Sequence, residues 1–250
     1  MSYRNLIKNV VEKPIRINKI ILKSIVLTMS LFWFLNIGLY AQPVEEGFVS
    51  MFNGKNLSEW EGMTKFWKVE NGAIVGETKT VNQQTLFLYW KGGEPADFEM
   101  CCRIRIAGKE GNSGIQIRSQ KRPKWDALGY QVDFDASGYC VGTIYQDNRK
   151  PLATFAQRGD SVLIDSTGKR SVNKFADSAK LIDVFKKGDW NEYRILAKGQ
   201  HVTIWMNGVL MCSVEDYEQE YTLPKGIIAL QLHSGEPMRV EFKDLRIRIN

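Results

Sequence analysis

The positive charge of this 250-residue chain is not evidence for nucleic-acid binding. The chain has 34 Lys and Arg against 28 Asp and Glu, but its first 41 residues hold six of the basic residues and only one acid. The other 209 residues therefore carry 28 basic and 27 acidic side chains, which is close to neutral and indicates no basic patch.

Residues 1–41 have the pattern of a targeting leader. A long basic start precedes an apolar run from Ser24 to Tyr40, and Ala41 offers a cleavage point. The apolar run is shorter than the roughly 20 residues of a membrane span. An uncleaved N-terminal anchor is the alternative, because the basic start is unusually long. We expect an exported protein, periplasmic or secreted, without stable membrane insertion after the leader is removed.

Residues 42–250 contain many short runs that are typical of strands. Asn71-Gly72 and Asn207-Gly208 each lie between two apolar runs, which is the strongest short signal of a β-hairpin. Thr85–Trp90 predicts a strand buried on both faces, whereas Ala176–Phe185 has only weak helical spacing. Further strands are predicted at Gly47–Phe52, Phe98–Ile106, Trp190–Ala197, Gln200–Met206, Gly226–His233 and Met238–Ile249. This pattern predicts one all-β domain, a two-sheet antiparallel β-sandwich.

The stretch from Gly111 to Gln146 has the most informative polar pattern. Apolar and polar residues alternate there with period two, which predicts strands with one buried face. The other face then carries amides, a guanidinium and carboxylates, at Gln116, Arg118, Gln131, Asp133 and Asp135. Such groups supply the donors and acceptors that sugar hydroxyls need. A well-solvated outer sheet face would show the same pattern, so the alternation alone leaves both interpretations open.

The four cysteines match no known disulfide framework. They are Cys101, Cys102, Cys140 and Cys212. Cys101 and Cys102 are adjacent on a predicted strand and so point to opposite faces. We expect mostly buried thiols, and the Cys and His spacings fit no zinc site.

Several long motifs along the chain carry a resemblance to a known family. In order they are GFVSMFNGKNLSEW at 47–60, WKVENGAIVGE at 67–77, the run 85–98, GNSGIQIRS at 111–119, GYQVDFD at 129–135, VGTIYQ at 141–146, GDWNEYRILAKG at 188–199, IWMNG at 204–208 and GIIALQLHSGEPMRVEFKDLRIR at 226–248. In these motifs the chain resembles the 3-keto-disaccharide hydrolase domain family, formerly domain of unknown function 1080. After GTIY, however, it departs from the family pattern with Gln146-Asp147-Asn148, which leaves substrate choice open.

The resemblance implies a fold, a location and a reaction. The fold is a concanavalin A-like sandwich, or jelly roll, with a concave groove facing the sugar, in an exported protein. The reaction acts on glycosides already oxidised to a ketone at C3, which acidifies the proton at C2. Loss of that proton lets the C1 leaving group depart, and water can then add. Such a site needs a base and a group that stabilises the enolate oxygen, but not the carboxylate pair of a retaining glycosidase.

The catalytic candidates are His233, Asp133 and Arg118. His233 is the first choice for the base, because the pKa of histidine lies nearest neutrality. Asp133 could orient His233, act as the base, or bind a divalent cation with His233 and Gln131, and the sequence leaves these roles open. Arg118 is the candidate to stabilise the enolate, with an ion pair to Asp133 or Glu99 as the alternative. That divalent metal cation is the one cofactor considered, and nothing in the spacing establishes it.

The remaining site candidates would bind an oligosaccharide or glycoside substrate. Gln116, Gln131 and Gln231 are predicted to bind hydroxyls, with Glu99 as a weaker member of the cluster. Tyr145 and Trp125 are predicted to stack on sugar faces, with packing in the core as the alternative.

Four further residues are interpreted as structural. Trp190 is expected in the core and His201 at the surface. Asn112 and Ser113 are expected to stabilise a turn, with contact to a ligand as the alternative.

Two other functions remain as rivals of the keto-dependent enzyme. A non-catalytic carbohydrate-binding module has the same fold but needs no titratable cluster. An ordinary glycosidase is disfavoured, because the sequence lacks the E-x-D-x-x-E motif of common sandwich glucanases.

Overall fold

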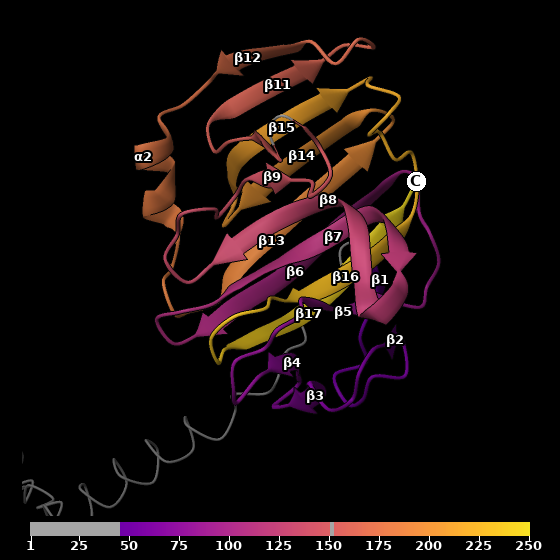
Figure 1. Cartoon of the computed structure of the whole chain (residues 1–250), viewed down its shortest axis with the longest axis vertical. Coiled ribbons are helices and arrows are strands. Elements are labelled where there is room, and N and C mark those ends of the chain that lie inside the picture. The colour runs from indigo at the N-terminus through magenta and orange to yellow at the C-terminus, as the bar shows by residue number, and fades with distance from the viewer. Residues whose placement is uncertain (1–45, 151–152) are drawn as a thin grey trace, which may run out of the picture. The chain divides into compact units, whose positions relative to one another are not determined.

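Two β-sheets packed face to face make up the part of the chain that this computed structural model describes, residues 46–150 and 153–250 (Figure 1). The predicted leader at 1–41 lies outside the described residues. Within the described ranges, no helix is long and apolar enough to cross a membrane.

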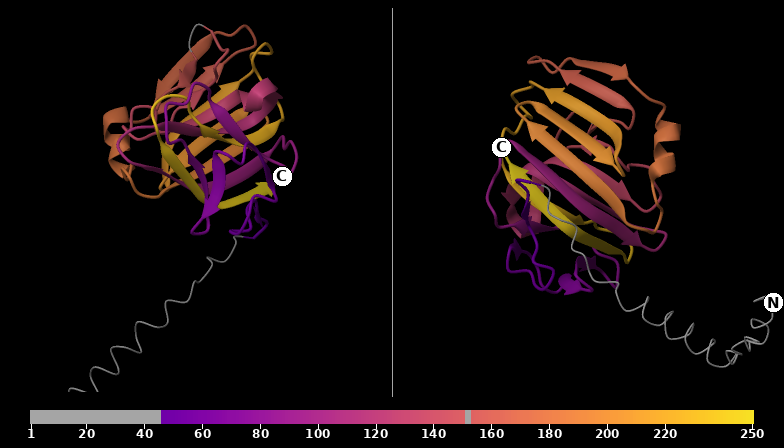
Figure 2. Two further views of the ribbon diagram at one scale, coloured as in Figure 1. Left: turned by 60° about the horizontal axis from the view of Figure 1, so that its bottom comes forward. Right: turned by 180° about the vertical axis from the view of Figure 1, so that it is seen from behind.

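The larger sheet has the strand order β12-β11-β15-β14-β13-β6-β17-β4-β3, and β1 pairs with β17. Neighbouring strands are antiparallel except β11 and β15, which run parallel. Seen from behind in Figure 2, this sheet is one continuous layer. Its strands are Val49–Ser50 (β1), Trp67–Glu70 (β3), Ala73–Glu77 (β4), Phe98–Ala107 (β6), Asp160–Ile164 (β11), Arg170–Lys174 (β12), Asn191–Lys198 (β13), His201–Met206 (β14), Val209–Asp216 (β15) and Arg239–Ile249 (β17).

The smaller sheet has the order β10-β9-β8-β7-β16-β5-β2. Its strands are Trp60–Glu61 (β2), Leu86–Trp90 (β5), Asn112–Arg122 (β7), Asp126–Asp135 (β8), Ile144–Tyr145 (β9), Thr154–Ala156 (β10) and Ile227–Leu232 (β16). Helical structure in the described residues is limited to short segments, η1 at Pro123–Trp125, α2 at Ser178–Leu181 and η2 at Ile182–Val184.

The predicted β-sandwich and its two hairpins are confirmed. Asn71 and Asn207 both have a φ of 50°, and the glycine after each also has a positive φ, as a tight two-residue hairpin requires. These turns join β3 to β4 and β14 to β15. The weak helical signal at Ala176–Phe185 corresponds to α2 and η2.

The hydrophobic core lies between the two sheets. Ile115, Ile117 and Val132 of the smaller sheet pack in one cluster with residues of the larger sheet such as Met100 and Phe242. The predicted two-sided burial of β5 is also observed, since all five of its residues are buried. The opposite face of the smaller sheet carries the polar side chains of the candidate site beside a small apolar cluster that includes Phe87, Tyr89 and Ala229.

The four cysteines are free thiols, three of them buried and Cys140 partly exposed. This agrees with the expectation of mostly buried thiols.

Trp190 does not lie in the core, so that expectation is wrong. Its ring is half-buried on the larger sheet between Lys243, at 4.1 Å, and the Arg105 guanidinium, at 4.6 Å. The strand pattern alone places the Trp190 ring in the core. In the structure the ring instead packs against two cationic side chains of the larger sheet.

Arg118 does not join the polar face, because the strand alternation breaks at its position. The register of β7 against β8 shifts between Ile117 and Gln120, and Arg118 has a φ of 47°. Its side chain is 1% exposed and reaches two loops of the larger sheet. There it donates to Ala96 O at 2.8 Å, Gly199 O at 2.6 Å and Asp97 Oδ1 at 3.1 Å. Arg118 therefore joins the two sheets.

We expect Arg118→Met to lower the free energy of unfolding by roughly 2–4 kcal/mol, because it removes three hydrogen bonds that a guanidinium, 1% exposed, makes between the two sheets. Arg122→Met is the matched control. Arg122 is exposed, and its ion pair among the described residues is with Asp126 at 3.4 Å, so its loss should cost less than about 0.5 kcal/mol. Urea unfolding measures both, and equal midpoints for the two variants would contradict this role of Arg118.

Candidate active site

The outer face of the smaller sheet carries a row of polar side chains. The register of β7 and β8 pairs Gln116 with Gln131 and Gly114 with Asp133. On the other side of β7, Gln116 pairs with Ala229 of β16, which brings Gln231 two residues further along the same face. Three strands thus bring three glutamines and one carboxyl group together, and each of these side chains is at most 6% exposed.

The carboxamide of Gln131 connects this row. Its Oε1 accepts from Nε2 of Gln116 at 3.0 Å and from Nε2 of Gln231 at 2.8 Å. Its Nε2 donates to Asp133 Oδ1 at 2.6 Å. Ser119 Oγ donates to Gln116 Oε1 at 2.5 Å. These contacts fix which end of the Gln116 and Gln131 carboxamides is the oxygen and which is the nitrogen. A reversed Gln131 would turn its oxygen toward the Asp133 carboxyl group and its N–H groups toward two other donors.

Gly114 provides the space in which the Gln131 side chain lies. A Cβ atom at this position would be 2.8 Å from Val132 O and 2.9 Å from Gln131 Cγ. Any larger residue would therefore displace Gln131 from Asp133.

Asp133 is a carboxyl group that titrates near neutrality. Burial raises its pKa from 3.8 to about 7, the negative charge of Asp135 contributes in the same direction, and hydrogen bonds from Gln131 and Thr143 oppose the change. Near neutral pH the group is therefore present both as acid and as carboxylate.

Asp135, two residues further along β8, stays ionised. Burial opposes its ionisation, but hydrogen bonds from Cys140 and Ser137 outweigh burial and lower its pKa. Asp135 Oδ2 accepts from Cys140 N at 2.6 Å and Sγ at 2.9 Å, and Oδ1 accepts from Ser137 N at 2.7 Å and Gly138 N at 2.8 Å. Two neighbouring carboxyl groups thus differ in protonation, as in other acid–base sites.

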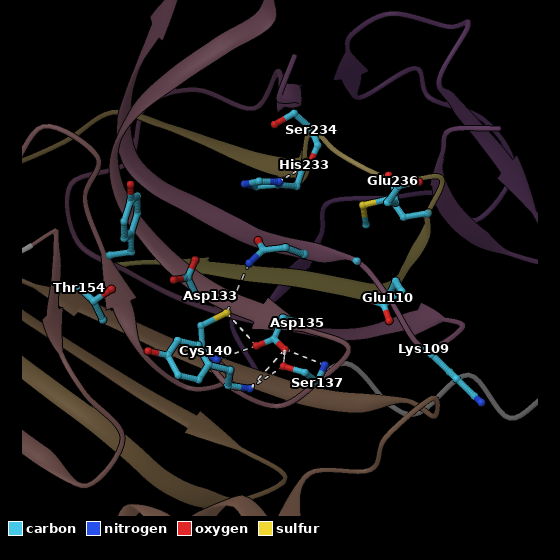
Figure 3. Close-up of a pocket in the computed structure, with 15 residues that line it drawn as sticks. Lys109, Glu110, Asp133, Asp135, Ser137, Cys140, Thr154, His233, Ser234 and Glu236 are labelled. Carbon is cyan, nitrogen blue, oxygen red and sulfur yellow. Dashed lines mark hydrogen bonds between the residues drawn. The ribbon is translucent and has the colours of Figure 1, made fainter. Parts of the chain in front are cut away.

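His233 follows the last residue of β16, with its ring directed into the same hollow as the Asp133 side chain (Figure 3). Its Nδ1 lies 2.5 Å from Ser234 O. A carbonyl oxygen only accepts, so Nδ1 is the donor in this contact, and in the tautomer that carries its proton there Nε2 is the acceptor.

Two cavities meet at these groups. A cavity of about 600 Å³ and one of about 290 Å³ share Asn112, Asp133, Tyr145 and His233 as lining residues. The predicted hydroxyl binders Gln116, Gln131 and Gln231 line the smaller cavity. Of the sequence candidates, the structure thus brings together Asp133, His233, Tyr145 and these three glutamines.

Glu99 and Trp125 do not line either cavity. Glu99 lies in β6 of the other sheet, where it pairs with Arg194 and with Arg248 Nη2 at 2.5 Å. The prediction that Glu99 belongs to the polar cluster is therefore wrong, because its strand lies in the larger sheet. Trp125 stacks on Tyr89 with ring centroids 5.7 Å apart, because η1 turns it onto an apolar patch beside the smaller cavity.

The suggested metal site lacks a full ligand set. Among the residues that the structure describes, no three His, Cys, Asp or Glu side chains lie close enough to hold a metal ion. The third suggested ligand, Gln131 Oε1, already accepts two hydrogen bonds. These residues therefore do not fit a metal, and we derive no step through one.

Two residues at the site differ from their sequence interpretation. Asn112, expected in a turn, begins β7, lines both cavities and has its Nδ2 3.6 Å from Cys140 Sγ. Ser113, also expected in a turn, is buried in β7 and donates to Gln231 O at 2.7 Å. No local signal separates such residues from turn residues, since their place depends on strands far away in the sequence.

Gln146, where the chain departs from the family pattern, is buried and structural. Its Nε2 donates to Tyr221 O at 3.0 Å, and its Oε1 accepts from Arg149 Nε at 3.1 Å. The next residue, Asp147, lines the smaller cavity and accepts from the Tyr145 hydroxyl at 2.8 Å.

Comparison with known proteins identifies a matching family. A sequence model of the family described as "3-keto-alpha-glucoside-1,2-lyase-like domain" matches residues 47–248. No curated protein is similar enough to this chain to count as a match.

Solved structures with similar folds include two crystal structures of a "putative glycosyl hydrolase" from Parabacteroides distasonis ATCC 8503. One has 21% identity and a TM-score of 0.53 and covers 82% of this chain and 94% of that chain. The other has 20% identity and a TM-score of 0.54 and covers 81% and 99%. The carbohydrate-binding module CBM66 from Bacillus subtilis has 16% identity, a TM-score of 0.48 and coverages of 77% and 97%, too distant to support an argument. These similarities establish the fold alone.

We expect Asp133→Asn to stabilise the protein at pH 8. Because the folded-state pKa is raised to about 7, the wild type loses stability as the pH rises through that value. Its stability at pH 8 should be lower than that of the variant by roughly 2–4 kcal/mol. Near pH 4 the two should be equal, since both side chains are then largely uncharged in the folded state. Urea unfolding across this range measures the difference, and a difference independent of pH would contradict the buried titration.

Proposed function

This chain belongs to the 3-keto-alpha-glucoside-1,2-lyase-like domain family, and from that premise we propose that it cleaves 3-keto-glycosides at C1. Family membership supports a role in carbohydrate chemistry. The observation that carries the finer proposal is that Asp133, with a pKa of about 7, and His233 both line the two cavities. Within the described residues the hydrogen bond of the His233 ring is made at Nδ1, which leaves Nε2 for the substrate.

In the proposed reaction, His233 Nε2 removes the proton at C2. The electron pair of that C–H bond moves toward the C3 carbonyl, which becomes an enolate. The enolate then re-forms the ketone, a C1–C2 double bond forms, and the C1–oxygen bond breaks. The carboxylic acid of Asp133 gives its proton to the departing oxygen. Water can add to the double bond, with oxygen at C1 and hydrogen at C2, for net hydrolysis.

The surroundings of the two groups support this division of roles. A buried carboxyl group with a raised pKa is suited to donate a proton. A neutral imidazole whose Nδ1–H is held by Ser234 O is suited to accept one at Nε2. The amide chain through Gln116 and Gln131 holds Asp133 in place, so we assign these two glutamines to positioning and not to hydroxyl binding.

Two neutral donors replace Arg118 as the proposed stabilisers of the enolate oxygen. Tyr145 and Asn112 line both cavities. Burial and a hydrogen bond to Asp147 raise the pKa of Tyr145 to about 12, so its hydroxyl keeps its proton at neutral pH. To stabilise the enolate, the hydroxyl would turn its one proton from Asp147 to the substrate oxygen. Tyrosine and asparagine both serve as oxyanion donors in enzymes.

Gln231 is the glutamine that we assign to a sugar hydroxyl. Its Nε2 is used by Gln131, but its buried Oε1 has no hydrogen-bond partner within the described residues. An acceptor without a donor is costly when buried, and a substrate hydroxyl would supply the donor.

We also propose that residues 1–41 direct export to the periplasm or the exterior, as their basic and apolar pattern indicates. N-terminal sequencing of the protein recovered outside the cytoplasm should begin at Gln42. Recovery from the cytoplasm alone would contradict export.

The wild type should release methanol from methyl 3-keto-glucoside but not from methyl glucoside. His233→Ala should lower this turnover by at least about 100-fold, as expected for loss of a general base. The matched control is His201→Ala, since His201 is an exposed surface histidine as predicted and lies in β14, away from both cavities.

The same assay separates the rival functions. Cleavage of methyl glucoside would indicate an ordinary glycosidase. Saturable glycan binding without cleavage of either compound would indicate a binding module. Full turnover by His233→Ala would rule out the proposed base.

The pH dependence tests the role of Asp133 as the acid. Because only its protonated form donates, kcat/KM for methyl 3-keto-glucoside should fall about tenfold per pH unit above about 7. The 4-nitrophenyl 3-keto-glucoside should not show this fall, since nitrophenoxide leaves without a proton. Asp133→Asn should therefore lose more activity on the methyl substrate than on the nitrophenyl substrate. A rate that rises with pH through 7 for both would make Asp133 the base.

A further inference from the structure

Tyr139 lies at the edge of the larger cavity with its ring in solvent. It lines that cavity and is 88% exposed, the largest value among the large hydrophobic side chains of the described chain. Its ring makes no hydrogen bond or ring contact with any described residue. An isolated exposed ring is common on protein surfaces. A function of Tyr139 therefore depends on its place at the cavity and on the hydrogen bonds that hold its backbone.

The backbone of Tyr139 is held by the same carboxylate that lies beside Asp133. Tyr139 N donates to Asp135 Oδ1 at 3.3 Å and to Ser137 Oγ at 3.2 Å. Asp135 also accepts from the backbone on both sides of Tyr139, from Gly138 N at 2.8 Å and Cys140 N at 2.6 Å. The loop thus presents an unpaired ring from a fixed backbone, which lowers the entropy cost of binding.

The two cavities differ in what they can hold. The smaller one is lined by Phe87 and by Gln231, whose Oε1 has no hydrogen-bond partner within the described residues, which suits one hydroxylated ring. The bond to be broken lies at C1, next to the C2 proton, so it must lie near the residues that both cavities share. If the 3-keto sugar occupies the smaller cavity, its leaving group extends into the larger one, where Tyr139 lies.

The charges of the larger cavity favour a neutral leaving group. The lining residues include one lysine, Lys109, and four acids, Glu110, Asp133, Asp135 and Glu236. This excess of negative charge disfavours an anionic group, while the carboxylates can accept from hydroxyls.

We propose that Tyr139 is the stacking platform for a neutral, ring-shaped leaving group of the substrate. The shared chemistry is a ring with an apolar face, which both a second sugar and an aromatic aglycone present. This inference rests on the proposed function, because it names the substrate class of the same site.

The test compares three 3-keto-glucosides, with methyl, phenyl and glucosyl leaving groups. In Tyr139→Ala, the KM for a ring-bearing substrate relative to the KM for the methyl substrate should rise roughly tenfold, the size expected for loss of an aromatic contact. Tyr139→Phe should keep the wild-type ratio, since the ring and not the hydroxyl makes the contact. The matched control is Tyr217→Ala, which removes another exposed tyrosine, 43% exposed and outside both cavities.

The outcomes separate the leaving-group sources and the two proposals. If the relative KM of Tyr139→Ala rises for the glucosyl substrate alone, the subsite binds a second sugar. If it rises for the phenyl substrate alone, the subsite binds an aromatic aglycone. An unchanged ratio for both overturns the inference while the proposed function stands. If the wild type cleaves none of the three, the proposed function fails. Calorimetric binding of the unoxidised disaccharide then tests Tyr139 directly, and equal affinity in wild type and Tyr139→Ala overturns it.

Discussion

The hydrogen bond from Gln131 to Asp133 is the interaction on which the candidate site depends. It exists because three neighbouring strands place Gln116, Gln131 and Gln231 in one row and because Gly114 leaves room above β7. In such a buried row the amides must satisfy one another, so each orientation determines the next. The last N–H of the row meets a carboxyl group that burial has brought to a pKa of about 7. Packing of the sheet thus sets the chemistry of the site.

Asp133 and Asp135 show how one strand gives two carboxyl groups different properties. Both lie on the outer face of β8 and both are buried. Asp133 receives too few hydrogen bonds to compensate for the loss of water, and its pKa is raised, whereas Asp135 receives several from the loop after β8 and its pKa is lowered. The first can exchange a proton at neutral pH. The second orders the loop that carries Tyr139, so acid–base chemistry and leaving-group recognition share one support.

Period-two alternation predicted the part of the site that lies on regular strands. Gln116, Gln131, Asp133 and Gln231 share a face because their strands keep a regular register there. Arg118 belonged to the same pattern, but a register shift in β7 turned it toward the larger sheet. Glu99 follows a correct alternation on the other sheet, and alternation cannot say which sheet a strand joins. Asn112 and Tyr139 carry no local signal, since their places depend on pairing and on a loop ordered by a distant carboxylate.

The central claim is that the protein removes a proton at C2 of a 3-keto sugar, and hydrogen exchange at that carbon tests it most directly. Cleavage of methyl 3-keto-glucoside in D₂O would be followed by NMR, with His233→Ala protein as the control for exchange in solution. The account predicts that the released sugar carries deuterium at C2 from the first turnovers and that the control leaves hydrogen there. A cleaved product that retains its original hydrogen at C2 would contradict the elimination and favour direct attack of water at C1.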